Sequence, residues 1–146
     1  TMEVLPIEVF GKGLEVICRF EAAGSFTRRY GAYIEEGTPL PQLIEISLKD
    51  DKRGDPFIEK DALVALEILT AEEHEQLVEM TKQITTLVRD LLAEKELHLI
   101  DIKLEFGRST QTGEILLIDE VSGGNMRVTR HGGPVDPLEI GSYLFS

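Results

Sequence analysis

A single long helix is the element that this sequence specifies most strongly. Thr70 is a favourable N-cap, and Glu73 follows three residues later, which completes a capping box. Apolar side chains then recur at helical spacing, at Leu77, Met80, Ile84, Leu87, Val88 and Leu91. The pattern predicts a helix over residues 71–94 whose apolar stripe belongs to the core and packs on a face of a sheet.

The segment after this helix alternates with the period of a strand. Over residues 97–106 one face carries His98, Ile100, Ile102, Leu104 and Phe106, and the opposite face carries Leu99, Asp101, Lys103 and Glu105. A turn-rich stretch, residues 107–113, then leads into residues 114–121, which are predicted to be the hairpin partner of this strand. One face of the strand therefore carries three charged side chains.

The other predicted elements are strands and loops. Residues 5–10 and 14–20 are expected to form a hairpin around the turn at Gly11 and Gly13, and residues 43–48 a further strand. Loop-like composition marks residues 22–30 and 31–42, and the end of the chain, residues 128–146, is expected to be irregular. Together these elements predict one α+β domain over residues 1–146, with antiparallel sheet hairpins and one long helix.

Charge and cysteine content exclude several classes of function. Fifteen basic and 27 acidic side chains give a net charge of −12, which disfavours nucleic acid or an anionic membrane as a partner. The only cysteine, Cys18, lies in an apolar run and reads as a packed thiol. No stretch approaches the ~20 apolar residues of a membrane span, and no signal pattern is present, so a cytoplasmic location is expected.

The first candidate site is the basic and small-residue segment at residues 19–30, RFEAAGSFTRRY. Arg19 supplies a bidentate fork for phosphate, and the Ala-Ala-Gly-Ser turn offers close backbone approach and the hydroxyl of Ser25. A surface loop with solvated arginines, including Arg28 and Arg29, explains the same residues equally well.

The second candidate site combines two acidic segments. Asp101, Lys103 and Glu105 on one strand face suit magnesium and phosphoryl groups, because Mg²⁺ typically takes one or two carboxylates plus substrate oxygens. Asp119 in the pair Asp119-Glu120 is a natural second ligand position if the hairpin brings it beside Glu105, and Arg127 can reach back toward an anion. The alternatives are an exposed sheet face with weak ion pairs and ordinary strand-end charges.

Five ordered motifs carry a resemblance to a known family. They are R-x-x-A-A-G-S, S-F-x-R-R-Y-G, L-K-x-D-x-x-x-D-P, D-x-K-L-E-F-G, and G-E-I-x-L-x-D-E-x-S followed by an arginine. In this order, from about Leu5 to Arg127, they resemble the SAICAR synthetases, ATP-dependent ligases of purine biosynthesis. The resemblance implies that the carboxylate of carboxyaminoimidazole ribotide is activated by the γ-phosphoryl group of ATP and then attacked by the amine of L-aspartate.

The resemblance also implies a role for each matching residue. It assigns the ribotide phosphate to Arg19, Ser25 and Arg127. It places Mg²⁺ on Glu105 and Asp119, and the ATP phosphates near Lys49. Lys103 and Asp101 are expected to position the reacting carboxylate, and Asp55 to lie near the aspartate or carboxamide end.

The sequence also departs from the family pattern. The glycine- and lysine-containing amino-terminal lobe that covers the nucleotide and the helical carboxyl-terminal tail have no counterpart here, Phe20 replaces an asparagine, and Ser122-Gly123-Gly124 replaces Ser-Pro-Asp. Three hypotheses follow. The chain is one piece of a synthetase completed by a separate lobe, a module that binds ribotide phosphate and Mg²⁺ without ligation, or an interaction protein on the same scaffold. A homo-oligomer is a further partner that the sequence leaves open.

Overall fold

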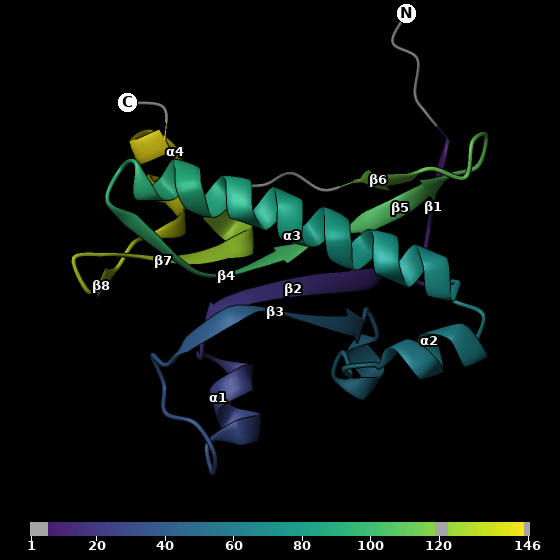
Figure 1. The fold of residues 1–146 in the computed structure, drawn as a ribbon, viewed down its shortest axis with the longest axis horizontal. Helices are drawn as coiled ribbons and strands as arrows, with labels where there is room; N and C mark the ends of the chain where they lie inside the picture. Colours follow the sequence, from purple (N-terminus) through teal and green to yellow (C-terminus); the bar gives the residue numbers. More distant parts are fainter. Residues whose placement is uncertain (1–5, 119–122, 145–146) are drawn as a thin grey trace, which may run out of the picture.

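The computed structural model describes residues 6–118 and 123–144, which form two antiparallel sheets and a long helix beside them (Figure 1). The larger sheet has the strand order β3-β2-β4-β7-β8, from β3 (Pro39–Leu48), β2 (Leu14–Glu21), β4 (Leu97–Leu104), β7 (Met126–Arg130) and β8 (Gly133–Pro134). The smaller sheet has the order β1-β5-β6, from β1 (Ile7–Val9), β5 (Phe106–Ser109) and β6 (Ile115–Leu117). The helices are α1 (Ser25–Tyr30), α2 (Lys60–Ala65), α3 (Ala71–Ala93) and α4 (Pro137–Leu144), with 3-10 turns at Asp51–Arg53 and Gly123–Asn125. The α+β class with one long helix is confirmed.

Helix α3 begins at the predicted capping box. The Thr70 hydroxyl accepts a hydrogen bond from the Glu73 backbone N–H at 3.1 Å, and Glu73 Oε1 accepts one from the Thr70 N–H at 2.9 Å. Two donors of the first helical turn that would otherwise lack a partner are therefore satisfied locally. This local chemistry explains why the start of α3 is predictable from sequence.

The prediction that the apolar stripe of α3 is buried is wrong toward the carboxyl end of the helix. Leu87 and Leu91 are 61% and 48% exposed, whereas the buried positions are Leu77, Thr81, Thr85 and Leu92. The threonines tolerate burial because each hydroxyl donates to the carbonyl four residues earlier, at 2.7 Å in both cases. The helix face toward the sheet thus follows a row that includes polar residues, which a search for apolar periodicity overlooks.

The predicted strand over residues 97–106 is divided into β4 and β5. An irregularity between Leu99 and Asp101 in the pairing with β7 shifts the alternation, so Leu99 and Ile102 both lie in the core. The face assignment fails for the first residues of the strand and holds from Asp101 onward, where Lys103 is exposed and Leu104 is buried.

The predicted amino-terminal hairpin is also wrong. β1 pairs with β5, with Ile7 opposite Ser109, and β2 lies between β3 and β4. Gly107 allows this contact, because a Cβ there would collide with the Ile7 side chain and the Glu8 carbonyl. The predicted pairing around residues 107–113 survives in part, since β6 pairs with β5 and places Leu117 opposite Phe106.

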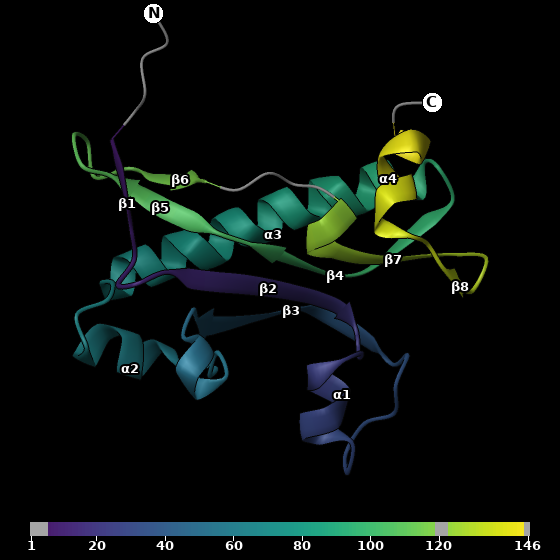
Figure 2. The ribbon, with the colours of Figure 1, turned by 180° about the vertical axis from the view of Figure 1, so that it is seen from behind.

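Three segments expected to be loops are ordered elements. Residues 25–30 form α1, and β3 begins at Pro39, which an edge strand tolerates because one side of its backbone needs no sheet partner. The segment expected to be irregular, residues 128–146, contains most of β7, β8 and α4. Seen from behind, α4 lies close to β7 (Figure 2), in agreement with the contacts between these elements.

Candidate functional site

One cavity of about 500 Å³ gathers most of the candidate residues. Its walls come from β2, α1, β4, β7 and the turn before residue 57. Six predicted site residues line it: Arg19, Ser25, Asp55, Asp101, Lys103 and Arg127. Residues separated by more than 100 positions in the sequence therefore share one hollow.

Arg19 is the buried centre of this site, with 2% of its side chain exposed. Its Nη2 donates to Ser25 Oγ at 3.0 Å, and its Nη1 to the Ala23 carbonyl at 3.2 Å and Asp101 Oδ2 at 3.3 Å. Its Nε donates to Glu45 Oε1 at 2.7 Å. The guanidinium fork thus joins the turn before α1 to the neighbouring strands.

Asp101 lies between two arginines. It stands opposite Arg19 in the β2–β4 register, and its Oδ1 is 3.2 Å from Arg127 Nε. Burial raises the pKa of the Asp101 carboxyl above its ordinary value, while Arg127 and Arg19 pull the pKa in the opposite direction. The Arg127 side chain is 53% exposed, so it presents positive charge to the cavity.

Gly24 allows Arg127 to approach the turn before α1. A Cβ at this position would collide with the guanidinium of Arg127. The backbone of Gly24 also has φ 58° and ψ −129°, a region that is essentially restricted to glycine. The Ala-Ala-Gly-Ser turn therefore lets the Arg127 side chain lie close to its backbone.

A smaller hollow of about 120 Å³ adjoins the cavity and is lined by Lys103 and Glu105, together with Glu15 and Asn125. Lys103 Nζ is 3.3 Å from Glu15 Oε2, and Lys49 Nζ is 2.7 Å from Glu105 Oε1. Lys49 and Glu105, which the sequence places 56 positions apart, thus form a pair beside the main cavity.

Asp55 and Asp119 differ from the other predicted site residues. Asp55 lines the cavity, and its Oδ1 also accepts a hydrogen bond from the Asp50 backbone N–H at 2.7 Å, which ties the turn together. Asp119 lies outside residues 6–118 and 123–144, so its predicted place beside Glu105 stays a prediction.

Sequence reasoning missed Glu45, which contacts Arg19 through the shortest of the Arg19 hydrogen bonds. A signal was present, because Glu45 is the only charged residue in the β3 sequence PLPQLIEISL. Arg28, interpreted as a solvated charge or a loop residue, lines the main cavity, whereas Arg29 lines a second cavity, and Phe57 lines both.

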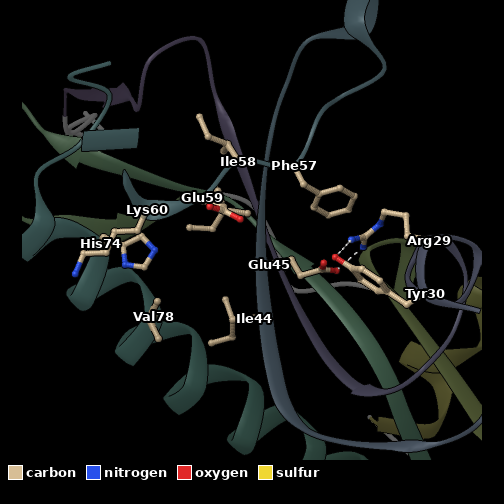
Figure 3. A pocket seen from close by; sticks show the side chains of 11 residues that line it. Arg29, Tyr30, Ile44, Glu45, Phe57, Ile58, Glu59, Lys60, His74 and Val78 are labelled. Atoms are coloured by element: carbon tan, nitrogen blue, oxygen red, sulfur yellow. Dashed lines mark hydrogen bonds and ion pairs between the residues drawn. The ribbon is translucent and has the colours of Figure 1, made fainter. Parts of the chain in front are cut away.

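The second cavity, about 410 Å³, lies along the β3 edge (Figure 3). Arg29, Tyr30 and Phe57 surround Glu45 at one end, and His74 and Lys60 lie at the other. Burial and the nearby Lys60 charge lower the pKa of His74 below its ordinary value.

Within the described part of the chain, no helix has the length and apolar character needed to cross a membrane.

Comparisons with known proteins agree with these motifs. The SAICAR synthetase family model matches residues 2–133. The chain is 52% identical over 140 residues to the phosphoribosylaminoimidazole-succinocarboxamide synthase of Clostridium tetani, covering 96% of this chain and 62% of that protein. It is 38% identical over 132 residues to the same-named protein of Thermotoga maritima, covering 90% of this chain and 56% of the relative.

Solved structures share the fold. A SAICAR synthetase in complex with ADP superposes with a TM-score of 0.82 at 27% identity, covering 99% of this chain and 64% of that one. The phosphoribosylaminoimidazole-succinocarboxamide synthase of Ehrlichia chaffeensis gives a TM-score of 0.81 at 27% identity, with coverage of 97% and 59%. The chain therefore spans between 56% and 64% of the length of these four proteins. By its family match and by these relatives, the chain belongs to the SAICAR synthetase family.

Proposed function

We propose that this chain supplies the ribotide-binding part of a SAICAR synthetase, which condenses carboxyaminoimidazole ribotide with L-aspartate at the expense of ATP. The observation that carries this proposal is the convergence of six predicted site residues on one cavity. The nucleotide-binding part is supplied by residues that the longer family members have outside the region matched by this chain. These residues belong to the same polypeptide or to a second one.

The phosphate of the ribotide binds at the α1 end of the cavity. Arg127, half exposed, and the Ser25 hydroxyl face the ligand there, and Arg28 adds a third donor group on the same wall. Arg19 lies behind them, with most of its N–H groups already engaged, so it contributes positive charge and holds Ser25 in place. Guanidinium groups suit this task because they form charge-assisted hydrogen bonds to phosphate.

The reacting carboxylate binds near Lys103 and Asp101, and the aspartate or carboxamide end lies near Asp55. An oxygen of the ribotide carboxylate attacks the γ-phosphorus, ADP leaves, and a mixed carboxylic–phosphoric anhydride forms. The aspartate amine then attacks the carbonyl carbon of this anhydride. The bond from that carbon to the bridging oxygen breaks, inorganic phosphate leaves with this oxygen, and the nitrogen loses a proton to give the amide. This chain contributes orientation and charge neutralisation, which is what phosphoryl transfer chiefly requires of a protein.

The residues available for Mg²⁺ fit an ion that is bound chiefly through nucleotide phosphates. Within residues 6–118 and 123–144, no cluster of three or more acidic, His or Cys side chains could hold a metal ion by itself. Mg²⁺ commonly takes only one or two carboxylates and completes its shell with phosphate oxygens and water. Glu105, beside Lys49, offers one such carboxylate, and Asp119 is the second one proposed. When bound, Mg²⁺ neutralises charge on the triphosphate.

A chimera tests the proposal. This chain replaces the aligned 140 residues of the Clostridium tetani relative, which retains its own remaining residues. We expect the chimera to form product only when ATP, L-aspartate and the ribotide are all present. A matched chimera that carries Asp101→Asn should fold and lose most of this activity.

A folded chimera that binds ADP and forms no product would contradict ligation by these residues. If such a chimera still binds the ribotide with normal affinity, the chain is instead a binding module that shares the scaffold.

A further inference from the structure

We propose that Glu45, held by Arg29, is a positioning residue that fixes the Arg19 guanidinium in the ribotide cavity. This name denotes the cavity of about 500 Å³ described above. The inference rests on the function proposed above and adds two residues to it. Neither Glu45 nor Arg29 lines the ribotide cavity, so both act through Arg19 rather than on the ligand.

One carboxylate oxygen joins the two arginines. Glu45 Oε1 accepts from Arg19 Nε at 2.7 Å and from Arg29 Nη2 at 2.8 Å. The Glu45 side chain is only 12% exposed, so these charges are poorly screened by water. Removing the negative charge of Glu45 therefore leaves two neighbouring guanidinium groups without their shared counter-ion.

Arg29 is itself held in place by aromatic side chains. Its guanidinium carbon lies 3.8 Å from the centroid of the Phe57 ring, and its Nη1 donates to Tyr30 Oη at 3.0 Å. Figure 3 shows Arg29 and Tyr30 facing Glu45, with Phe57 above them. Stacking on an aromatic face fixes the plane of the guanidinium, which an ammonium group cannot reproduce.

The contacts form a chain of alternating charge from the β3 edge to the ribotide cavity. It runs from Arg29 to Glu45, Arg19, Asp101 and Arg127. Without Glu45, Asp101 is the one carboxylate among residues 6–118 and 123–144 that remains paired with Arg19, and the fork is drawn toward it. That movement disturbs the Arg19 contact with Ser25 and the Asp101 contact with Arg127, both of which face the ligand.

The test is the affinity of this chain for carboxyaminoimidazole ribotide, measured by calorimetry. Glu45→Gln keeps the shape of the side chain and removes its charge. We expect it to weaken binding roughly 10-fold, the scale found for residues that orient metal-binding side chains. Glu59→Gln is the matched control, since Glu59 is exposed and lines the same edge cavity as Glu45, and it should bind like the unmodified chain.

Coupling separates positioning from a merely structural role. In an Arg19→Lys background, Glu45→Gln should cause no further loss of affinity, because the fork that Glu45 holds is gone. Losses that simply add would overturn the inference, as would a folded Glu45→Gln variant with unchanged affinity. If Glu45→Gln does not fold, Arg29→Met replaces it, with a several-fold loss expected and unchanged affinity as the contrary result. Failure of the unmodified chain to bind the ribotide would contradict the proposed function itself.

Discussion

Arg19 on β2 and Asp101 on β4 face each other across two paired strands, and their side chains meet at 3.3 Å with 2% and 8% exposed. A buried ion pair is weak evidence for stability, because removing two charges from water costs about as much as their attraction returns. Here each partner has a second charge, Glu45 for Arg19 and Arg127 for Asp101. Under the proposed function, this arrangement presents fixed charge to a ligand.

The contact between Gly24 and Arg127 predicts coupled effects on stability. Gly24→Ala should lower the free energy of unfolding by about 1–3 kcal/mol because alanine is strained in this backbone conformation. The collision of its Cβ with the guanidinium should add to this cost. Arg127→Ala removes the collision, so the double variant should recover about 0.5–3 kcal/mol relative to additivity. Urea unfolding of the four proteins measures this coupling.

Gly113 is the control for that cycle. It has φ +75°, and nothing lies within 4 Å of the Cβ that alanine would add there. Gly113→Ala should therefore carry a conformational cost and show no coupling to Arg127→Ala. Additive effects at Gly24 would show that the guanidinium does not lie against this turn.

The pairing of Glu73 with Arg108 predicts a pH-dependent contribution to stability. Arg108 Nε and Nη2 donate to the two Glu73 carboxylate oxygens at 2.6 and 2.8 Å. Burial opposes ionisation of Glu73, but hydrogen bonds from Arg108 and Thr70 lower its pKa below the ordinary 4.5. A carboxyl with a lowered folded-state pKa stabilises the protein above the unfolded-state pKa, and this contribution is lost as pH falls through the folded-state pKa.

Glu73→Gln should therefore cost about 1.5–3 kcal/mol at pH 7, and the cost should shrink as the pH falls below 4.5. Denaturant unfolding at several pH values measures the difference, with Glu72→Gln, in the same helical turn and exposed, as the comparison. A cost for Glu73→Gln that stays constant down to pH 3 would refute the role of its charge.

Two adjacent leucines test which face of α3 packs on the sheets. Leu92 is fully buried and Leu91 is 48% exposed. Leu92→Ala should lower the free energy of unfolding by about 2–5 kcal/mol, and Leu91→Ala by about 0.5 kcal/mol or less. Because both substitutions change leucine to alanine in one helix, intrinsic helix propensity cancels. Equal costs would mean that the apolar stripe continues through Leu91 and that the burial of α3 is misassigned.

Local chemistry was predictable from sequence, and long-range pairing was less so. The capping box at Thr70 uses residues three positions apart, so the start of α3 follows directly from the sequence. The partner of β1 is more than 90 positions away, and nothing near Ile7 marks it. The shift between Leu99 and Asp101 is likewise unmarked, because alternation continues through it in the sequence.

The candidate site was likewise predictable from the sequence only in part. Family motifs identified residues that line one cavity, including Arg19 and Asp101, which stand in register on neighbouring strands. Glu45 was missed because its role depends on the β2–β3 register and on a helix that the small-residue segment did not predict. Charge in a half-buried edge strand is the signal that points to such a residue.

The most direct test of the central claim is a calorimetric titration of this chain with carboxyaminoimidazole ribotide, alongside the same titration of the Arg127→Ala variant. Binding to one site is predicted, weakened in the variant by about 1.5–3 kcal/mol through loss of a charged phosphate contact. No binding to the folded chain, or equal affinity in the two proteins, would contradict the assignment of this cavity as the ribotide site.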